Sequence, residues 1–160
     1  MKSVVLYYSR SGNTKKIAKK IVESFGCDEV FIEPEQEYGN YVSSLIRFGR
    51  EKNSDQPVKY KTPIQDLSKY DVIFVGFPVW GGKMPEFMQS YLSDCNLGEK
   101  TVIPFVSAGS NGRKSSLQNV HMLTQNCMDE LYFYTSLISR NDVDEWLDKV
   151  KIQTCGEPVQ

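Results

Sequence analysis

Short apolar runs alternate with segments of helical periodicity along this chain, and the alternation limits its fold more than any other feature. Five runs have the composition of buried strands: Val4–Tyr8, Val30–Ile32, Val72–Phe77, Val102–Val106 and Leu131–Ile138. The helical segments are Ile17–Phe25, 40–51, Pro85–Leu92, Ser115–Met128 and Asn141–Val150. Strands that alternate with helices pair in parallel, because a parallel crossover needs a connection of helix length. We therefore predict a three-layer, doubly wound α/β fold with a five-stranded parallel sheet in the order 2-1-3-4-5.

Single residues refine this prediction at the ends of the elements. Gly26 stands where a helix C-cap belongs, and Asn141 can cap the last helix. Pro85 suits the first turn of its helix. Pro104 conflicts with a central strand because it has no N–H for the ladder, so we expect a bulge or a local break beside it.

The length and composition fit a single domain spanning residues 1–160. With 40% hydrophobic and 24% charged residues, the composition is that of an ordinary globular protein. The longest apolar run, Val72–Val79, is too short to span a bilayer, and the N-terminus lacks the apolar core and cleavage site of a signal peptide. We expect a cytoplasmic protein with no membrane partner.

The cysteines and the single histidine suggest neither metal binding nor side-chain catalysis. Cys27, Cys95, Cys127 and Cys155 lie far apart, which favours free thiols over disulfides or a metal site. His121 falls in a polar helical stretch and is expected on the surface, so a Ser–His–Asp site has little support. The sequence therefore predicts no metal site and no catalytic side chain.

Lysines gathered near the N-terminus raise the question of nucleic-acid binding. Lys15, Lys16, Lys19 and Lys20 share a helix with an apolar stripe, and acidic residues follow them, so that the whole chain has a net charge of −1. A solvated helix face explains these lysines better than a nucleic-acid surface does. We predict no nucleic-acid partner.

The turn after the first strand is rich in hydrogen-bond donors. It comprises Ser9, Arg10, Ser11, Gly12, Asn13 and Thr14 and opens directly onto a helix N-terminus. Free backbone N–H groups and the helix dipole attract an anion there, so a phosphate fits. The alternative is that Ser11 or Asn13 only caps the helix, although a cap explains one polar side chain and not several.

Other phosphate-binding patterns are missing from this first loop. The sequence contains neither G-x-x-x-x-G-K-S/T nor an opening G-x-G-x-x-G, which disfavours P-loop nucleotidases and dinucleotide-binding proteins. A phospho-accepting receiver domain needs acidic residues after its first and third strands, and here Ser9 and Pro78 stand at those positions.

Two further loops follow the third and fourth strands, which neighbour the first in the predicted sheet. The second loop contains Pro78, Val79, Trp80, Gly81 and Gly82, and the third contains Ser107, Ala108, Gly109 and Gly112. We expect Trp80 to be a poor core residue and a good wall for a flat aromatic ring, unless it is an incidental surface residue in a tight turn. The third loop either borders a polar heterocycle or is an ordinary flexible connection.

Together the three loops resemble those of flavodoxin-like proteins that bind flavin mononucleotide (FMN). Ser9–Thr14 is similar to their phosphate-loop signature, Ser/Thr-x-Ser/Thr-Gly-x-Thr, and residues 78–82 and 107–112 are similar to their second and third flavin loops. The resemblance implies a flavodoxin-like fold with FMN as cofactor. It also implies that the first loop holds the FMN phosphate, that 78–82 contacts the isoalloxazine, and that Ser107, Ala108, Gly109 and Gly112 border its pyrimidine side.

Two departures from familiar electron-carrier flavodoxins leave the finer function open. The chain is near neutral, whereas those carriers are strongly acidic, and residues 35–63 are longer than an ordinary connection. The spacing of Tyr38, Tyr41, Leu45 and Phe48 predicts an extra amphipathic helix in that segment. Together with Arg47 and Arg50 this helix either shapes one side of a pocket beside the flavin, or its aromatic residues only hold the helix against the sheet.

Three functions fit these observations. The first is electron transport between redox protein partners. The alternative is an oxidoreductase, an FMN-dependent NAD(P)H:quinone-type reductase acting on a small nicotinamide or quinone substrate. The third is a non-redox module that binds some other phosphorylated ligand.

Overall fold

The computed structural model has a five-stranded parallel sheet in the order β2-β1-β3-β4-β5, as the sequence predicts. It describes residues 1–54, 56–109, 113–128, 130–134 and 140–156. The strands are β1 (Ser3–Tyr7), β2 (Asp28–Phe31), β3 (Val72–Pro78), β4 (Thr101–Ala108) and β5 (Leu131–Tyr134). The helices are α1 (Asn13–Phe25), α2 (Tyr41–Lys52), α3 (Glu86–Cys95), α4 (Arg113–Leu123) and α5 (Arg140–Cys155).

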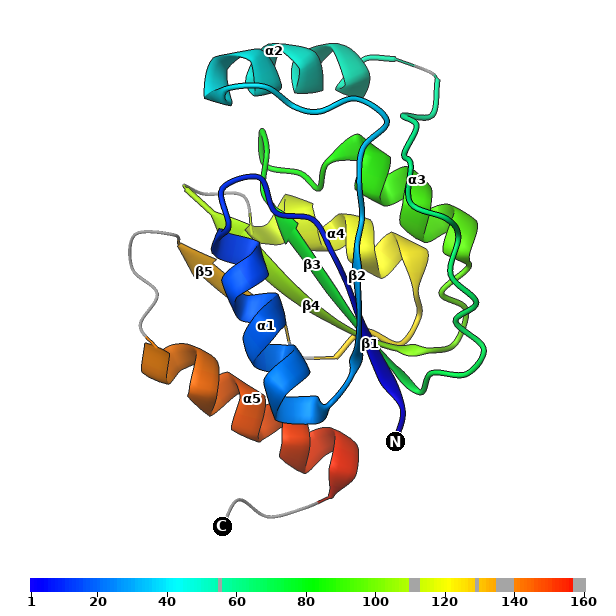
Figure 1. Ribbon diagram of the computed structural model, residues 1–160, viewed down its shortest axis with the longest axis vertical. Helices are drawn as coiled ribbons and strands as arrows, with labels where there is room; N and C mark the ends of the chain where they lie inside the picture. The colour runs from blue at the N-terminus through cyan, green and yellow to red at the C-terminus, as the bar shows by residue number, and fades with distance from the viewer. Residues whose placement is uncertain (55, 110–112, 129, 135–139, 157–160) are drawn as a thin grey trace.

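The helices form a layer on each face of the sheet (Figure 1). Helices α1 and α5 cover one face, where Trp146 packs on Phe74 with 6.3 Å between ring centroids. Helices α3 and α4 cover the other face, where Phe87 and Leu117 are buried. Helix α2 lies outside these two layers, beyond the carboxyl end of the strands (Figure 1).

Central strand β3 is buried on both sides, as its continuous apolar sequence predicts. Its residues alternate between the two faces, with Phe74 on the α1/α5 side and Val75 on the α3/α4 side. Gly76 leaves room for the neighbouring ring of Phe105, because a Cβ at Gly76 would lie 2.1 Å from Phe105 Cζ. The glycine therefore allows two adjacent strands to pack closely over the core.

Strand β4 contains Pro104 and pairs with β3 without interruption, Pro104 standing opposite Val75. Its pairing on the other edge is broken. Val102 pairs with Cys127, whereas Phe105 pairs with Leu131, so the register slips by one residue between the two pairs. Pro104 lies in this interval, and the expected local break beside it is confirmed.

The ends of several elements differ from the sequence prediction. Helix α4 ends at Leu123 and not at Met128, because Met128 N–H donates to Val102 O at 2.9 Å and draws that stretch to the sheet. Helix α5 begins at Arg140, so the predicted cap Asn141 lies inside the helix. Pro85 is the N-cap of α3, one residue before its first turn. Gly26 is the C-cap of α1, with φ 60°, as predicted.

The extra helix predicted within 35–63 exists as α2, although its buried side differs from the expectation. Phe48 is buried and so is Tyr38 just before the helix, but Leu45 is 38% exposed. Polar residues take the place of Leu45 on the inner side: Ser44 is buried, and Arg47 and Glu51 are mostly covered. The apolar spacing alone could not reveal this, because the helix buries an ion pair.

Several single-residue expectations agree with the structure. The four cysteines form no disulfide, and His121 is exposed on α4. Lys15 and Lys16 are exposed on α1. Among the described helices, none combines the length and the apolarity that crossing a bilayer requires.

Candidate functional site

The first two predicted loops and the described part of the third, 107–109, meet at the carboxyl ends of the adjacent strands β1, β3 and β4 (Figure 1). Ser107 joins them. Its Oγ lies 2.8 Å from Thr14 Oγ1 in a buried hydrogen bond to the first loop, and its carbonyl accepts from Val79 N–H of the second loop at 2.7 Å. The three segments therefore share one rigid junction.

Some of the predicted site residues belong to strands and not to loops. Pro78 is the last residue of β3, and Ser107 and Ala108 are the last two of β4, both buried. Gly109 follows as an exposed residue, and Gly112 lies outside the described residues. Strand β4 extends beyond its apolar run, which ends at Val106. The polar side chain of Ser107 is tolerated in the buried strand because its hydroxyl forms a hydrogen bond with Thr14.

The N-terminus of α1 is open to an anion. Its N-cap is Gly12, at φ 88°, and no side chain makes a capping hydrogen bond there, so the alternative that Ser11 or Asn13 is an ordinary cap is wrong. The first turn contains no acidic residue. Its N–H groups have no acceptor within the helix, and the dipole makes this end positive.

A buried hydroxyl with no hydrogen-bond partner lies beside this helix end. Ser9 Oγ is inaccessible to solvent and bonds to no other described residue. The neighbouring Ser11 Oγ accepts from Asn13 Nδ2 at 3.1 Å and is exposed, as is Arg10. Unsatisfied buried hydroxyls are rare because each costs free energy. An anion with several acceptor oxygens, such as a phosphate ester, would satisfy both the Ser9 hydroxyl and the N–H groups at the start of α1.

The second loop forms a tight hairpin at residues 80–83. Trp80 and Lys83 exchange two backbone hydrogen bonds of 2.9 Å, and the central residues Gly81 and Gly82 have φ 53° and 79°. Two positive φ angles are the pattern of a type I′ turn, which strongly favours glycine. A Cβ at Gly81 would also lie 2.7 Å from Phe48 Cε1 of α2. The backbone angle thus favours glycine at both positions, and packing against Phe48 is a second requirement at Gly81 alone.

The expectation that Trp80 is a poor core residue is wrong. Its side chain is 7% exposed, and three rings approach it at steep angles: Tyr38 at 4.6 Å, Tyr8 at 5.8 Å and Phe48 at 6.2 Å between centroids. Tyr38 and Phe48 come from the long 35–63 segment, so the loop sequence alone gave no sign of them. Burial, with a smaller contribution from Glu37, raises the pKa of Tyr8 to about 12 and keeps its hydroxyl neutral.

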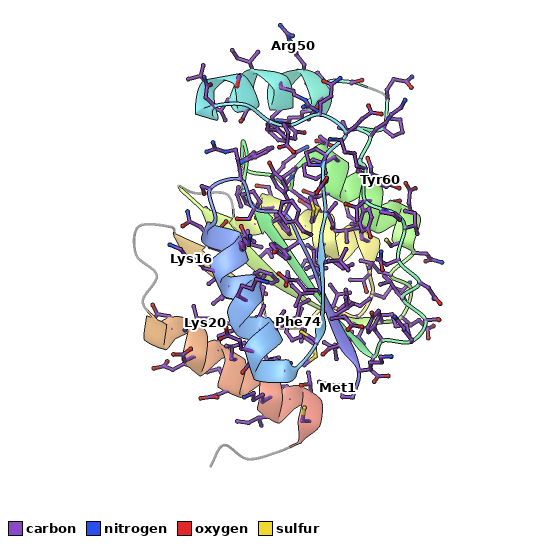
Figure 2. The ribbon with its side chains drawn as sticks, viewed as in Figure 1. Met1, Lys16, Lys20, Arg50, Tyr60 and Phe74 are labelled. Carbon is purple, nitrogen blue, oxygen red and sulfur yellow. The ribbon has the colours of Figure 1, made fainter. Side chains whose placement is uncertain are left out.

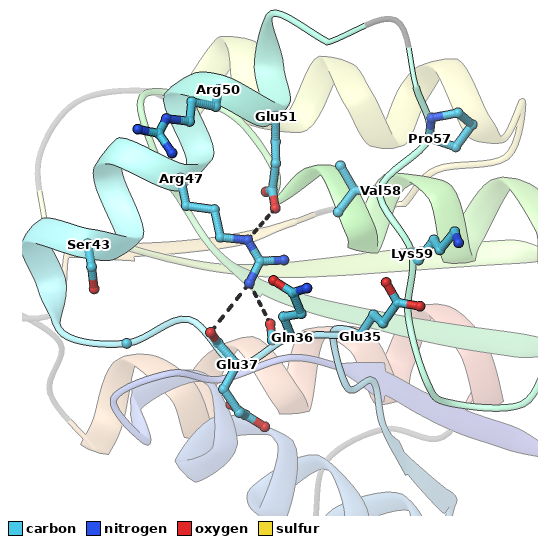
Figure 3. Close-up of a pocket in the computed structure, with 11 residues that line it drawn as sticks. Glu35, Gln36, Glu37, Ser43, Arg47, Arg50, Glu51, Pro57, Val58 and Lys59 are labelled. Carbon is cyan, nitrogen blue, oxygen red and sulfur yellow. Dashed lines mark hydrogen bonds and ion pairs between the residues drawn. The ribbon is translucent and has the colours of Figure 1, made fainter.

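An ion-pair network ties α2 to the segment before it (Figure 3). Arg47 Nε bonds to Glu51 Oε1 at 2.6 Å, and Arg47 Nη1 donates to Gln36 O at 2.6 Å. The guanidinium also lies 4.1 Å over the ring of Tyr38, whose hydroxyl donates to Glu51. The spacing of four residues between Arg47 and Glu51 is a helical signal that is visible in the sequence.

A pocket of about 620 Å³ lies on the same side of α2. Arg47 and Arg50 line it together with residues of 35–37 and 57–59, whereas Tyr38, Leu45 and Phe48 are not among its lining residues (Figure 3). Its described lining includes none of the three loops. Tyr38 connects the two regions, because its ring contacts both Arg47 and Trp80.

We expect Arg47→Met to lower the free energy of unfolding by about 1–3 kcal/mol, because it removes the ion pair and leaves Glu51 partly buried without its cation. Arg50→Met is the matched control on the same helix. Arg50 is exposed and pairs with no other described residue, so its loss should change stability by less than about 0.5 kcal/mol. Urea denaturation measures both, and equal effects would contradict the assigned role of Arg47.

Comparison with known proteins agrees with this geometry. A candidate flavoprotein from Bacteroides uniformis has a TM-score of 0.78 and 25% identity, and the match covers 91% of this chain and 97% of that one. A flavoprotein from Lactobacillus acidophilus, solved with FMN, has a TM-score of 0.72 at 21% identity, covering 91% and 97%. An NADH:FMN oxidoreductase in its apo form has a TM-score of 0.58 at 15% identity, covering 99% and 92%.

The two more distant structures show similarity of fold alone, and no curated protein matches the sequence significantly. The flavodoxin family model matches residues 2–150, which include all three loops as far as Gly112. The match spans the sheet and four of its connecting helices, together with the junction at Ser107. The chain therefore belongs to the flavodoxin family.

Proposed function

We propose that this protein binds one FMN non-covalently at the three loops and uses it to transfer electrons. The observation that carries the proposal is the buried, unpartnered Ser9 Oγ beside an α1 N-terminus that no side chain caps. Both features provide hydrogen-bond donors for the oxygens of a phosphate ester. Membership of the flavodoxin family and the similar structure solved with FMN favour FMN as the molecule that carries this phosphate. Bound flavin would supply one- and two-electron chemistry that amino-acid side chains do not offer.

The residues divide into those that touch the phosphate and those that hold the loops in place. Ser9, Ser11, Gly12 and Asn13 would bind the phosphate through hydroxyls and backbone N–H groups. Thr14 is 1% exposed and engaged with Ser107, so its role is to fix the first loop against β4. Arg10, exposed at the loop, adds positive charge.

The second and third loops would border the flavin ring. Gly81 is the exposed residue of the second loop and Gly82 is half-buried, whereas the indole of Trp80 is buried in the aromatic cluster. Trp80 then supports the turn from its buried side and does not present its face as a stacking wall. Gly109 and Gly112 would complete the border beside Ser107 and Ala108.

An FMN-dependent reductase is the second candidate, and the pocket at α2 favours it. A volume of about 620 Å³ is within the range of small-molecule sites. Tyr38 does not line the pocket, but its ring contacts both Arg47 of the pocket wall and Trp80, so a single aromatic ring would lie between a nicotinamide or quinone held there and the second loop.

Reduction by nicotinamides separates the two candidates. For an electron carrier we expect purified, FMN-loaded protein to show no turnover with NADH or NADPH, and transfer to a protein partner that depends on salt. For a reductase, nicotinamide-driven reduction of a quinone would resist salt and fall in Tyr38→Ala, with the fold intact. The measurement is the steady-state rate with NADH or NADPH as electron donor and a quinone or a c-type cytochrome as acceptor, over a series of salt concentrations. Salt-resistant nicotinamide turnover would overturn the carrier proposal.

A further inference from the structure

Helix α2 has three exposed aliphatic side chains and a mostly buried ion pair. Val42, Leu45 and Ile46 are 63%, 38% and 55% exposed, and their spacing of three and four residues places them on one side of the helix. We call these three residues the outer strip. On the opposite side, Arg47 and Glu51 pair with each other and with the segment 36–38 (Figure 3).

Cations border the outer strip. Arg50 follows Ile46 by four residues and Lys52 follows Leu45 by seven, and both are exposed. Figure 2 shows Arg50 extending from α2 away from the sheet. From Asn40 to Ser54 the single acidic residue is Glu51, which Arg47 and Tyr38 already engage. The exposed side of α2 is therefore aliphatic and positive, although the whole chain has a net charge of −1.

The outer strip lies close to the candidate flavin site. Phe48 projects from the inner side of α2 to within 2.7 Å of the position that a Cβ on Gly81 would occupy. One helix diameter, about 10 Å, therefore separates the strip from the turn that would contact the flavin. Lys15 and Lys16 extend the positive charge along the start of α1 at the same end of the sheet.

We infer that the outer strip is the docking surface for a redox protein whose own contact face has aliphatic residues surrounded by carboxylates. The inference rests on the proposed electron-transfer function. Three aliphatic side chains bury little area, which suits the small, transient interfaces of electron-transfer pairs. A second copy of the chain would bring Arg50 and Lys52 against their own equivalents and is disfavoured by like charge.

A plant-type [2Fe–2S] ferredoxin, an acidic protein, is a suitable probe. The reduced cluster gives up one electron to oxidised flavin, and a second ferredoxin provides the next, with protons taken from water. We expect the second-order rate constant of this transfer to fall with rising salt.

Val42→Ser/Ile46→Ser should lower this rate constant about fivefold or more at any salt, since the apolar centre of an interface carries much of its affinity. Arg50→Glu/Lys52→Glu should lower it about tenfold or more at low salt, with the salt dependence lost.

Matched controls lie on other helices. Met122 on α4 is 74% exposed, and Lys151 is on α5, so Met122→Ser and Lys151→Glu should leave the rate unchanged. FMN affinity and the rate of reduction by dithionite should be the same in all variants, because the outer strip is not part of the flavin site. A failure of FMN binding would disprove the proposed function separately, before any transfer is measured. Oxidised ferredoxin binding, followed by amide chemical shifts, would then still test the docking surface.

Three results would overturn the docking proposal. The first is an equal ferredoxin rate in the wild type and both α2 variants. The second is a wild-type dimer in sedimentation that Val42→Ser/Ile46→Ser dissociates, which would assign the strip to a second copy. The third is sedimentation with anionic phospholipid vesicles that depends on the same residues, which would assign it to a membrane.

Discussion

Ser9→Ala should weaken FMN binding by roughly ten- to 150-fold while leaving the apoprotein as stable as the wild type or more so. A hydrogen bond to a charged group contributes about 1.5–3 kcal/mol, which corresponds to that range in affinity. In the apoprotein the Ser9 hydroxyl is buried without a partner, so its removal relieves a cost of about 1 kcal/mol or more. The two effects therefore have opposite signs.

Fluorescence titration with FMN and urea denaturation of the apoprotein measure the two effects. Riboflavin affinity should not change in Ser9→Ala, because riboflavin has no phosphate. Ser90→Ala on α3 is a suitable control, since Ser90 Oγ donates to Glu86 O within its own helix. A loss of apoprotein stability together with unchanged FMN affinity would show that Ser9 is structural and does not bind the cofactor.

Gly81→Ala should destabilise the protein by about 2–4 kcal/mol, and Gly82→Ala by only about 1–2 kcal/mol. Both residues have positive φ, so each alanine incurs the left-handed backbone penalty. Gly81→Ala incurs a second cost because its Cβ would lie 2.7 Å from Phe48 Cε1, whereas at Gly82 the nearest described atom is Ser115 Oγ at 3.6 Å. The two glycines thus form a matched pair that separates packing from backbone strain.

The double variant Gly81→Ala/Phe48→Leu tests the packing contribution directly. If Phe48 causes the extra loss, the combined effect should be smaller than the sum of the single effects. In FMN-loaded protein, both glycine variants should also shift the flavin midpoint potentials by roughly tens of millivolts if the turn borders the ring as we propose. Equal stabilities in Gly81→Ala and Gly82→Ala would contradict the contact with Phe48.

Much of the fold follows from the sequence because both sides of the central strands are apolar. The continuous apolar run of β3 and the helical spacing of α1 define strand and helix without knowledge of tertiary structure. The order of the strands follows from the general rule for doubly wound sheets. Pro104 even indicated where the ladder between β4 and the next segment is interrupted.

The surroundings of Trp80 were not predictable in the same way. Its burial depends on Tyr38 and Phe48, which lie more than thirty residues earlier in the chain. The prediction that Leu45 lies on the inner side of α2 is wrong for a related reason. The inner side of that helix is held by Arg47 and Glu51, and an apolar periodicity cannot report a buried ion pair.

The polar junction of the site was only partly visible in the sequence. Ser9, Ser11, Gly12 and Thr14 form a recognisable pattern, but nothing in it indicates that Thr14 bonds to Ser107 while Ser9 is left without a partner. Which of the two hydroxyls has a partner depends on where β4, which contains Ser107, ends relative to the start of α1. We therefore propose that the hydroxyl of Thr14 supports the loop, whereas the sequence pattern predicts it as a phosphate ligand.

The central claim, that the first loop holds the phosphate of FMN, is tested most directly by titrating the apoprotein with FMN and with riboflavin. We expect one FMN per chain and an affinity at least roughly a hundredfold higher for FMN, since two charge-assisted hydrogen bonds to phosphate suffice for that difference. Equal affinities for the two flavins, or no binding of either, would contradict it.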